Sequence, residues 1–553
     1  MNRRFRWNHG WFWFSALLTL AVAFPIAFIL FKVVGSGTEL WNSLNTPTVH
    51  RYLWNTGWLA LGVGVLTLGF GGVTAWLITA YDFPGRRWLG SALILPLVFP
   101  AYILAYTYAG IFDFTGPIET TLRGWFGDAS SGKYIPFEFT NIYGLIFLLS
   151  CNLYPYVYMT MRASFVQQSQ RMLELTRSFG VGPIPTFFRV VLPLARPAMV
   201  AGLTLCLLEV INDFGAAEYF GVDTFATAIY RTWFSRGNYP LAMRLAAFLM
   251  LIVAVILLLE QWQRRRVRYE EGSKSSVRVE PYKLKGWKAW AASLFCFFPF
   301  FFGFLLPMLQ LLAWTARHFS GIEWTGEFGA ILKNTLLLAL CASIVTVLCA
   351  LILAYTLRLF SDSWIRLLSK LALIGYAVPG TVIAVGVMAV GHPVQRWLVK
   401  YNMLSTSDSQ LYLWGCLLML FAFLVRFLMV AYSPIDASFQ RTGRHFNEAA
   451  RLLGASPLKT LFRVEIPMIS SGLLAAMLLV LIDTLKELPL TLFLQPVGFR
   501  TLSTKIYYIA KNMESVEESA VYAVVIALLG LLPVYLIYRS LLRDSHSTSR
   551  TNP

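Results

Sequence analysis

Two pairs of carboxylates stand within apolar stretches of this chain. Glu209 and Asp213 are four residues apart, and Asp483 and Glu487 repeat this spacing 274 residues later. Residues four apart share one face of a helix, so each pair is predicted to point its carboxylates in one direction. Because an ionised carboxylate facing lipid is costly, such residues face the protein interior, pair with a base or line a pathway. A symmetric set of carboxylates suits a hard cation, which prefers oxygen ligands.

Structural roles for the same acids stay open at this point. They can pair with nearby bases such as Lys486, or lie in water at the outer rim of a membrane. Tight ligation inside a membrane would also slow the release of a cation, which favours a weak electrostatic funnel. The four acids are therefore candidates for lining a translocation path, and no residue is assigned as a metal ligand.

The elements that must position these acids are membrane-spanning helices. Of the 553 residues, 57% are hydrophobic and only 13% are charged, about half the charged share of a soluble domain. Apolar runs of about 20 residues, the length needed to cross a bilayer, recur along the chain. The predicted fold is an all-α polytopic membrane protein with about twelve spans. The spans are 12–33, 56–80, 91–112, 141–161, 198–219, 240–260, 289–315, 335–357, 368–390, 412–432, 471–493 and 520–541.

A twenty-residue polar segment occurs twice in the chain. Residues 174–193 and 448–467 agree at nine of twenty positions without a gap, at an offset of 274. The identities are Glu174/Glu448, Arg177/Arg451, Gly180/Gly454, Pro183/Pro457, Thr186/Thr460, Phe188/Phe462, Arg189/Arg463, Val190/Val464 and Pro193/Pro467. Further matches at an offset of 279 relate 55–100 to 334–379.

The duplication predicts two homologous six-helix halves. The first half is 1–260 and includes the polar loop 162–196, and the second is 289–553 and includes the loop 433–470. Because each half has an even number of spans, the two have parallel topology. The charged, serine-containing stretch 261–288 is predicted to be a cytoplasmic linker between them.

Glycine and proline predict the local shape of the repeated segment. Gly180 and Gly454 suit the left-handed position that ends a helix. A proline then opens the next helix, at Pro183 after a glycine and at Pro457 after the better N-cap Ser456. Each copy is thus predicted to be helix, tight turn and helix, which is a rigid projection from the membrane.

Basic residues gather in alternate loops, which accounts for the net charge of +18 without a nucleic-acid partner. The N-terminus, the 162–196 and 261–288 loops and the C-terminal tail are all basic. By the positive-inside rule, both termini and both repeated segments are predicted to be cytoplasmic. The first apolar run is interpreted as an uncleaved helix. The six cysteines and six histidines show no ligand spacing.

The second repeated segment resembles a known signature. Glu448-Ala449-Ala450, then Gly454 and Ile466-Pro467, is similar to the EAA motif of ABC importer permeases. Glu174, Gly180 and Leu192-Pro193 form a degenerate first copy. The resemblance implies two type I permease halves, each with a coupling helix that sits in a cleft of an ATPase subunit. It implies these ATPase-coupling residues: Glu174, Arg177, Gly180, Pro183, Glu448, Ala449, Ala450, Arg451, Gly454 and Pro457.

A chain with both halves fused looks most like the ferric-iron importer permeases. The stretches 82–87, 213–215 and 219–225 resemble that group. Fused thiamine and phosphonate permeases are similar, so these substrates stay open. The resemblance implies a multi-pass protein of the bacterial inner membrane that takes Fe(III) from a periplasmic binding protein, with the carboxylates along its path.

The chain lacks a GxxxxGK[ST] phosphate loop, so it is not expected to be an enzyme or to bind a cofactor. ATP and Mg²⁺ would be used by a partner, and two coupling segments imply two copies of an ATPase subunit. The alternative from a different class is a twelve-helix secondary transporter driven by an ion gradient. A membrane enzyme is disfavoured, because no His/Cys/Asp cluster or nucleophile–base arrangement is evident.

Overall fold

The membrane-spanning character of the chain is evident in its helices. The computed structural model describes residues 10–531 except 35–45, 128–133, 135–137, 168–182, 266–280, 319–325, 361–362, 404–406, 444 and 513–515. Within this part, eight helices are long and apolar enough to cross a membrane, and up to eleven spans result if three bent helix pairs count as one each. The predicted spans from 12–33 to 471–493 each overlap one of these. The predicted span 520–541 extends past residue 531, outside the described residues.

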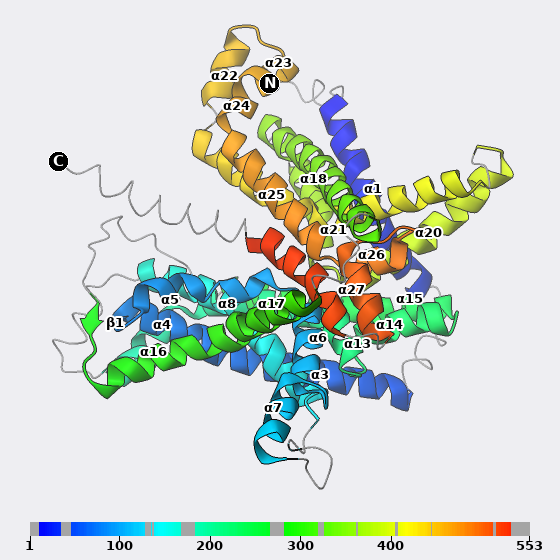
Figure 1. Cartoon of the computed structure of the whole chain (residues 1–553). Coiled ribbons are helices and arrows are strands. Elements are labelled where there is room, and N and C mark those ends of the chain that lie inside the picture. The colour runs from blue at the N-terminus through cyan, green and yellow to red at the C-terminus, as the bar shows by residue number, and fades with distance from the viewer. Residues whose placement is uncertain are drawn as a thin grey trace, which may run out of the picture. The chain divides into compact units, whose positions relative to one another are not determined.

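The elements up to residue 265 are almost all helical (Figure 1). They are α1 (Gly10–Val34), α3 (Pro47–Thr67), η2 (Leu68–Gly72), α4 (Val73–Ala80), β1 (Tyr81–Asp82), α5 (Arg86–Ala92), η3 (Leu95–Val98), α6 (Ala101–Phe112), α7 (Pro117–Phe126), α8 (Ile142–Gln167), α10 (Pro183–Thr186), η4 (Phe187–Val191), α11 (Leu192–Leu194), α12 (Arg196–Asn212), α13 (Gly215–Tyr219), α14 (Phe225–Tyr230), η5 (Arg231–Ser235) and α15 (Tyr239–Arg265).

The later elements follow a related order. They are β2 (Tyr282–Lys283), α16 (Trp287–Phe300), η6 (Phe301–Leu305), α17 (Leu306–His318), α18 (Glu327–Leu359), α19 (Ser363–Leu373), η8 (Ile374–Ala377), α20 (Gly380–Lys400), α21 (Asp408–Thr442), α22 (His445–Leu452), α23 (Pro457–Thr460), η9 (Leu461–Glu465), α24 (Ile466–Met468), α25 (Ser470–Lys486), α26 (Pro489–Leu494), α27 (Leu502–Lys511) and η10 (Val516–Ser519).

The duplication extends to helix boundaries. Elements α10, η4, α11 and α12 recur as α23, η9, α24 and α25, and every first and last residue is displaced by 274 positions. The short helix η3 recurs as η8 at a displacement of 279. The two-half fold predicted from the sequence is therefore confirmed, and matched positions can be compared residue by residue.

Two matched prolines interrupt the third span of each half. Phe99 and Val378, which precede them, are extended with ψ angles of 128° and 130°, because a residue before proline is driven away from helical geometry. In the first half the chain bends by 94° at Pro100. In the second half α20 starts after Pro379, so the span predicted at 368–390 is displaced to Gly380–Lys400.

Contacts divide the chain into two compact units. Unit 1 comprises 1–46, 228–250 and 321–508, and unit 2 comprises 47–227, 251–320 and 509–553. In unit 1, the helices α18, α21 and α25 pack on one another, and α20 and α26 lie against them. In unit 2, α8 packs on α12 and on the continuous run α3–η2–α4.

Each unit contains the first span of the other sequence half. In unit 1, α1 packs on α18, α19 and α20, and Ser15 Oγ donates a buried hydrogen bond of 2.8 Å to Thr356 Oγ1. In unit 2, a Cβ added to Gly303 of η6 would lie 2.2 Å from the carbonyl oxygen of Cys151 in α8. That close approach explains why glycine is needed there. The predicted division at the 261–288 linker remains a prediction, and the compact units cut across it.

Candidate functional site

The second repeated segment, residues 445–468, folds as helix, turn and helix. Helix α22 ends at Leu452, and Gly454 then adopts a left-handed φ of 78°. The Gly454 amide donates to the Arg451 carbonyl at 3.0 Å, and the Ala455 amide donates to the Ala450 carbonyl at 3.0 Å. These two bonds form the motif that commonly ends a helix with glycine. The predicted left-handed, helix-ending conformation of Gly454 is confirmed.

The second helix of this segment begins as its sequence predicts. Ser456 is the N-cap of α23, and its hydroxyl oxygen accepts from the Lys459 amide at 3.3 Å. Pro457 occupies the first helical turn, where a missing amide hydrogen leaves no intrahelical bond unmade. One π-helical turn, η9, and the short α24 then lead into α25. The turn is thereby fixed at both of its ends.

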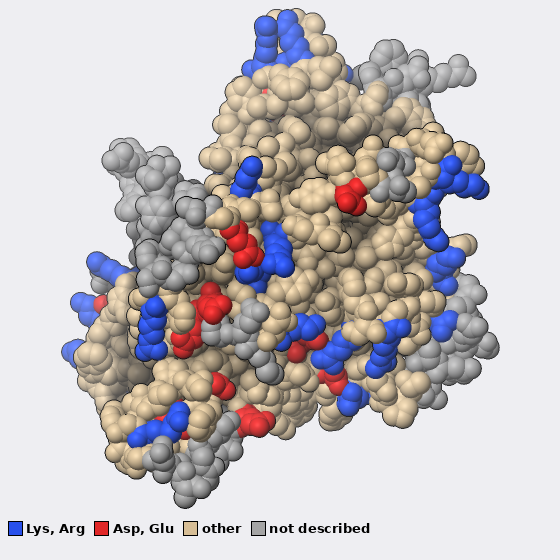
Figure 2. Space-filling view, turned by 45° about the vertical axis from the view of Figure 1, so that its right-hand side comes forward, with Lys and Arg blue, Asp and Glu red and all other residues tan. Residues whose placement is uncertain are grey.

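The turn presents apolar side chains to the outside. Leu452 and Leu453 are 88% and 89% exposed, and Leu458 is also exposed. The predicted residues Glu448, Ala449 and Arg451 are exposed as well, whereas Ala450 is half-buried. Figure 2 shows basic side chains gathered over the projection formed by α22 and α23. Adjacent exposed leucines on a polar turn are typical of a surface that contacts another protein or the membrane.

A buried charge cluster ties this segment to the end of α18. Arg358 Nε lies 3.0 Å from Glu465 Oε1, and their side chains are 7% and 1% exposed. Asn447 Nδ2 donates to the same oxygen at 2.9 Å. Arg358 also donates to the Phe439 carbonyl at 2.7 Å and to the Gly443 carbonyl. No local sequence pattern points to this cluster, because its members lie up to 107 residues apart.

The first repeated segment is described only in its second part. Glu174, Arg177 and Gly180 lie outside the described residues. Helix α10 starts at Pro183, as predicted, and η4 and α11 follow it into α12. Thus the connection from Pro183 or Pro457 into the fifth span consists of the same elements in both copies.

The second members of the carboxylate pairs lie just beyond helices rather than within them. Asp213 follows the last residue of α12, and Glu487 follows the last residue of α25. Asp213 Oδ2 accepts from the Ala217 amide at 3.0 Å, and Glu487 Oε1 accepts from the Leu490 amide at 3.3 Å. Each acid therefore stabilises the first turn of the next short helix, where exposed amides and the helix dipole favour a negative charge.

Glu487 also pairs with a base that the sequence analysis overlooked. Arg426 Nε in α21 lies 3.3 Å from Glu487 Oε2, with side chains 10% and 8% exposed. A Cβ added to Gly380 would lie 2.7 Å from Arg426 Nη1 and 2.8 Å from Glu487 Oε1. The lone arginine in the apolar run 420–430 was the signal available in the sequence.

The remaining two acids lie one turn earlier on the same helices. Glu209 and Asp483 are half-buried. Asp483 interacts electrostatically with Lys486, Arg426 and Glu487, so the second half holds two acids and two bases in one cluster. At the position matching Arg426, the first half has the buried residue Asn152. The carboxylates are thus symmetric in position but not in their electrostatic surroundings.

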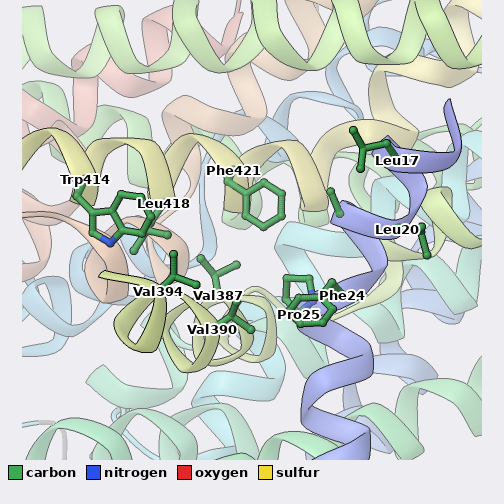
Figure 3. A pocket seen from close by; sticks show the side chains of 12 residues that line it. Leu17, Leu20, Phe24, Pro25, Val387, Val390, Val394, Trp414, Leu418 and Phe421 are labelled. Atoms are coloured by element: carbon green, nitrogen blue, oxygen red, sulfur yellow. The ribbon is translucent and has the colours of Figure 1, made fainter. Parts of the chain in front are cut away.

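An apolar pocket of about 410 Å³ lies between α1, α20 and α21 of unit 1 (Figure 3). Its wall includes Leu20, Phe24, Val390 and Leu418, and Trp414 closes one end. None of the acids or bases described above lines it. Among the described residues, no three His, Cys, Asp or Glu side chains converge as a metal site. A charged solute would find no charged partner in this pocket.

The duplicated order of membrane helices, with the second repeated segment projecting before α25, is typical of a two-half membrane permease. Residues 67–269 and 346–545 each match the family model described as binding-protein-dependent transport system inner membrane component. Because the two matches cover more than half of the chain, the chain belongs to this family and contains its domain twice. It is therefore a multi-pass inner membrane protein and a permease of the ABC importer family.

Several relatives match either the whole chain or one half of it. The Fe(3+)-transport system permease protein FbpB 2 of Haemophilus influenzae is 24% identical over 539 residues, 95% of this chain and 98% of that protein. A probable ABC transporter permease protein of Sinorhizobium fredii is 23% identical over 518 residues, 89% of this chain and 88% of that protein. The molybdenum transport system permease protein ModB of Escherichia coli is 28% identical over 229 residues, 40% of this chain and 96% of that protein.

The buried ion pair predicts how unit 1 responds to substitution. Glu487→Gln removes the carboxylate that pairs with the buried Arg426 and should lower the free energy of unfolding by about 3 kcal/mol, the lower end for breaking a buried pair, because Asp483 still interacts with Arg426. The matched control is the double variant Arg426→Asn with Glu487→Asp, which installs the residues of the first half. We expect the double variant to melt closer to wild type in detergent. Equal melting of Glu487→Gln and wild type would contradict a buried ion pair.

Proposed function

We propose that this chain imports ferric iron as the permease subunit of an ABC importer. A separate ATPase, present in two copies, powers transport and docks on the two repeated segments. A periplasmic binding protein delivers the substrate, and both termini lie in the cytoplasm. The observation that carries the ATPase docking is the exposed, rigid turn of the second segment, with Leu452 and Leu453 bare at its tip.

Ferric iron is favoured by the architecture of the relatives. The relative named for Fe(3+) transport has the same fused two-half form and aligns over nearly its entire length. Sulfate is the second candidate, because a probable sulfate transport system permease protein of Nephroselmis olivacea is 25% identical over 46% of this chain. Relatives named for sulfate and molybdenum align with only half of the chain, so they support the permease class more than the substrate.

The proposed mechanism is alternating access. ATP binding closes the ATPase dimer, and the two repeated segments move with it. Each segment continues directly into a fifth span, α12 or α25, that carries the acids. Displacement of a segment therefore displaces Glu209 in one half and Asp483 in the other. Movement of the two halves would expose a central path first to one side of the membrane and then to the other.

Uptake in cells tests the substrate. Cells lacking this chain should lose most uptake of radioactive Fe(III) and keep uptake of radioactive sulfate, and expression of the wild-type chain should restore the iron signal. Loss of sulfate uptake alone would favour the second candidate. Iron uptake driven by a proton gradient without ATP would instead support a secondary transporter.

Replacement of Gly454 tests the docking turn. Gly454→Val should abolish Fe(III) uptake, because a β-branched residue in left-handed geometry costs about 1–2 kcal/mol and deforms the turn. Gly454→Asn is the matched control, since asparagine tolerates this geometry. An added Cβ meets no atom within 4 Å, so the backbone conformation alone distinguishes the variants. Both proteins should reach the membrane at wild-type levels, and normal uptake by Gly454→Val would count against ATPase docking.

Neutralising the first members of the carboxylate pairs tests the path. Glu209→Gln with Asp483→Asn should slow Fe(III) uptake by about tenfold, the effect of about 1.4 kcal/mol of lost electrostatic attraction on a rate. Co-purification of the ATPase should be unchanged. Asp408→Asn at the exposed start of α21 is the control and should transport normally. Unchanged uptake in the double variant would make these acids structural.

A further inference from the structure

The two halves anchor their repeated segments by different chemistry. In both, described residues of the repeated segment contact the end of the second span, and the end of the fourth span adjoins the same place. Residues 163–165 and 437–439 both read Ala-Ser-Phe, so the ends of α8 and α21 align at the offset of 274. The end of α18 aligns with the end of α4 at the offset of 279. These joints can therefore be compared position by position.

In the second half, the joint consists of charged and directional bonds. Arg358 binds Glu465 of η9 and the backbone at the end of α21, and its guanidinium lies 4.9 Å from the centre of the Phe439 ring. One turn earlier on α18, Tyr355 Oη donates to the Pro457 carbonyl at 2.8 Å. Asn447 of α22 completes the cluster through Glu465. Four elements thus meet at one buried guanidinium and carboxylate.

In the first half, uncharged residues stand at the matching positions. Thr79 replaces Arg358, and its hydroxyl bonds to the Ala75 carbonyl of its own helix at 2.7 Å. Val191, which is buried, replaces Glu465. Trp76 replaces Tyr355 and packs on the rings of Phe165 and Phe187, with centroid distances of 5.7 Å and 5.4 Å.

The two kinds of joint respond differently to force. Buried charge-assisted hydrogen bonds fix distance and direction, and separating the partners leaves a desolvated charge. The hydrophobic effect is not directional, so packed rings lack the fixed bonding directions of an ion pair and leave no desolvated charge when they shift. Helix α18 has 33 residues and is about 50 Å long at 1.5 Å per residue. It packs along α21 and α25, so a displacement of its end reaches the helix that carries Asp483.

We propose that Arg358 and Glu465 form a rigid joint that transmits displacement of the second repeated segment to α18. The first half makes the corresponding connection by apolar packing between its described residues. The two ATPase contacts are then mechanically unequal, and the second half is the stiffer transmitter. Arg358 and Glu465 are positioning residues, because they act through the segment and do not touch substrate. This inference rests on the proposed ATPase docking.

The decisive variant replaces the joint with the residues of the first half. Arg358→Thr with Glu465→Val removes both charges together, so no unpaired charge stays buried, and it should be less destabilising than the loss of one charge alone. In liposomes with its ATPase and Fe(III)-loaded binding protein, we expect iron transported per ATP hydrolysed to fall at least tenfold. Cross-linking through Leu453→Cys should show that the ATPase still docks. The matched control, Thr79→Ser with Val191→Ile, should keep the wild-type ratio.

Two further variants separate transmission from stability. Glu465→Gln leaves Arg358 without a countercharge and should melt lower than the double variant. If stability alone governed transport, the double variant would transport more iron per ATP than Glu465→Gln and would reach the wild-type ratio. That result would show that the proposed joint is wrong. Tyr355→Phe removes one hydroxyl from the joint without altering a charge, and it should lower the transport ratio at an unchanged melting temperature. A wild-type ratio in the double variant would overturn the proposal, and a wild-type ratio in Tyr355→Phe alone would exclude Tyr355 from the joint.

Experiments on a chain with an intact joint test the proposed ATPase docking separately. If no ATPase cross-links through Leu453→Cys in an otherwise wild-type protein, and no ATP-dependent uptake follows, both proposals fall. If wild type couples normally and the Arg358→Thr, Glu465→Val variant couples equally well, the docking proposal stands and only the joint is refuted.

Discussion

The hydrocarbon core of the bilayer imposes the constraint on which this structure depends. Backbone amides and carbonyls find no water there, so each must bond within the protein. Long helices satisfy this condition, and the described chain consists of them almost entirely. Breaks within the bundles then need their own partners. Asp213 and Glu487 supply these at the starts of α13 and α26, so the acids that suggest a path for cations also hold the broken helices together.

Charges inside such a bundle are costly, and the two halves carry different numbers of them. The second half pairs Arg426 with Glu487 and Arg358 with Glu465. At the matching positions the first half has Asn152, Asp213, Thr79 and Val191. An internal duplication has therefore kept its helix boundaries while its buried electrostatics diverged. Equivalent positions in the two halves need not have the same role, even where the backbone geometry repeats.

The arrangement of first spans shows a limit of dividing a chain by sequence. Homology places α1 with the first half and α16–α17 with the second. Packing places α1 against α18 and α20, and η6 against α8. Each compact unit therefore takes in the opening span of the other sequence half. Lateral packing of long apolar helices depends on small residues at contact points, such as Gly303, more than on order along the chain.

The sequence by itself determined the membrane class, the duplication, nearly all spans and the shape of the second repeated segment. These follow from local rules: the apolar length needed to cross a bilayer, left-handed glycine at Gly454 and a cap at Ser456 before proline. Only the tertiary structure decided the partners of the buried charges. Arg426 meets Glu487 across 61 positions and Arg358 meets Glu465 across 107, and helix packing alone brings such distant residues together. Tertiary packing also decided that each compact unit takes in the first span of the other half. Apolar helices of similar length carry no local sequence signal that specifies their neighbours.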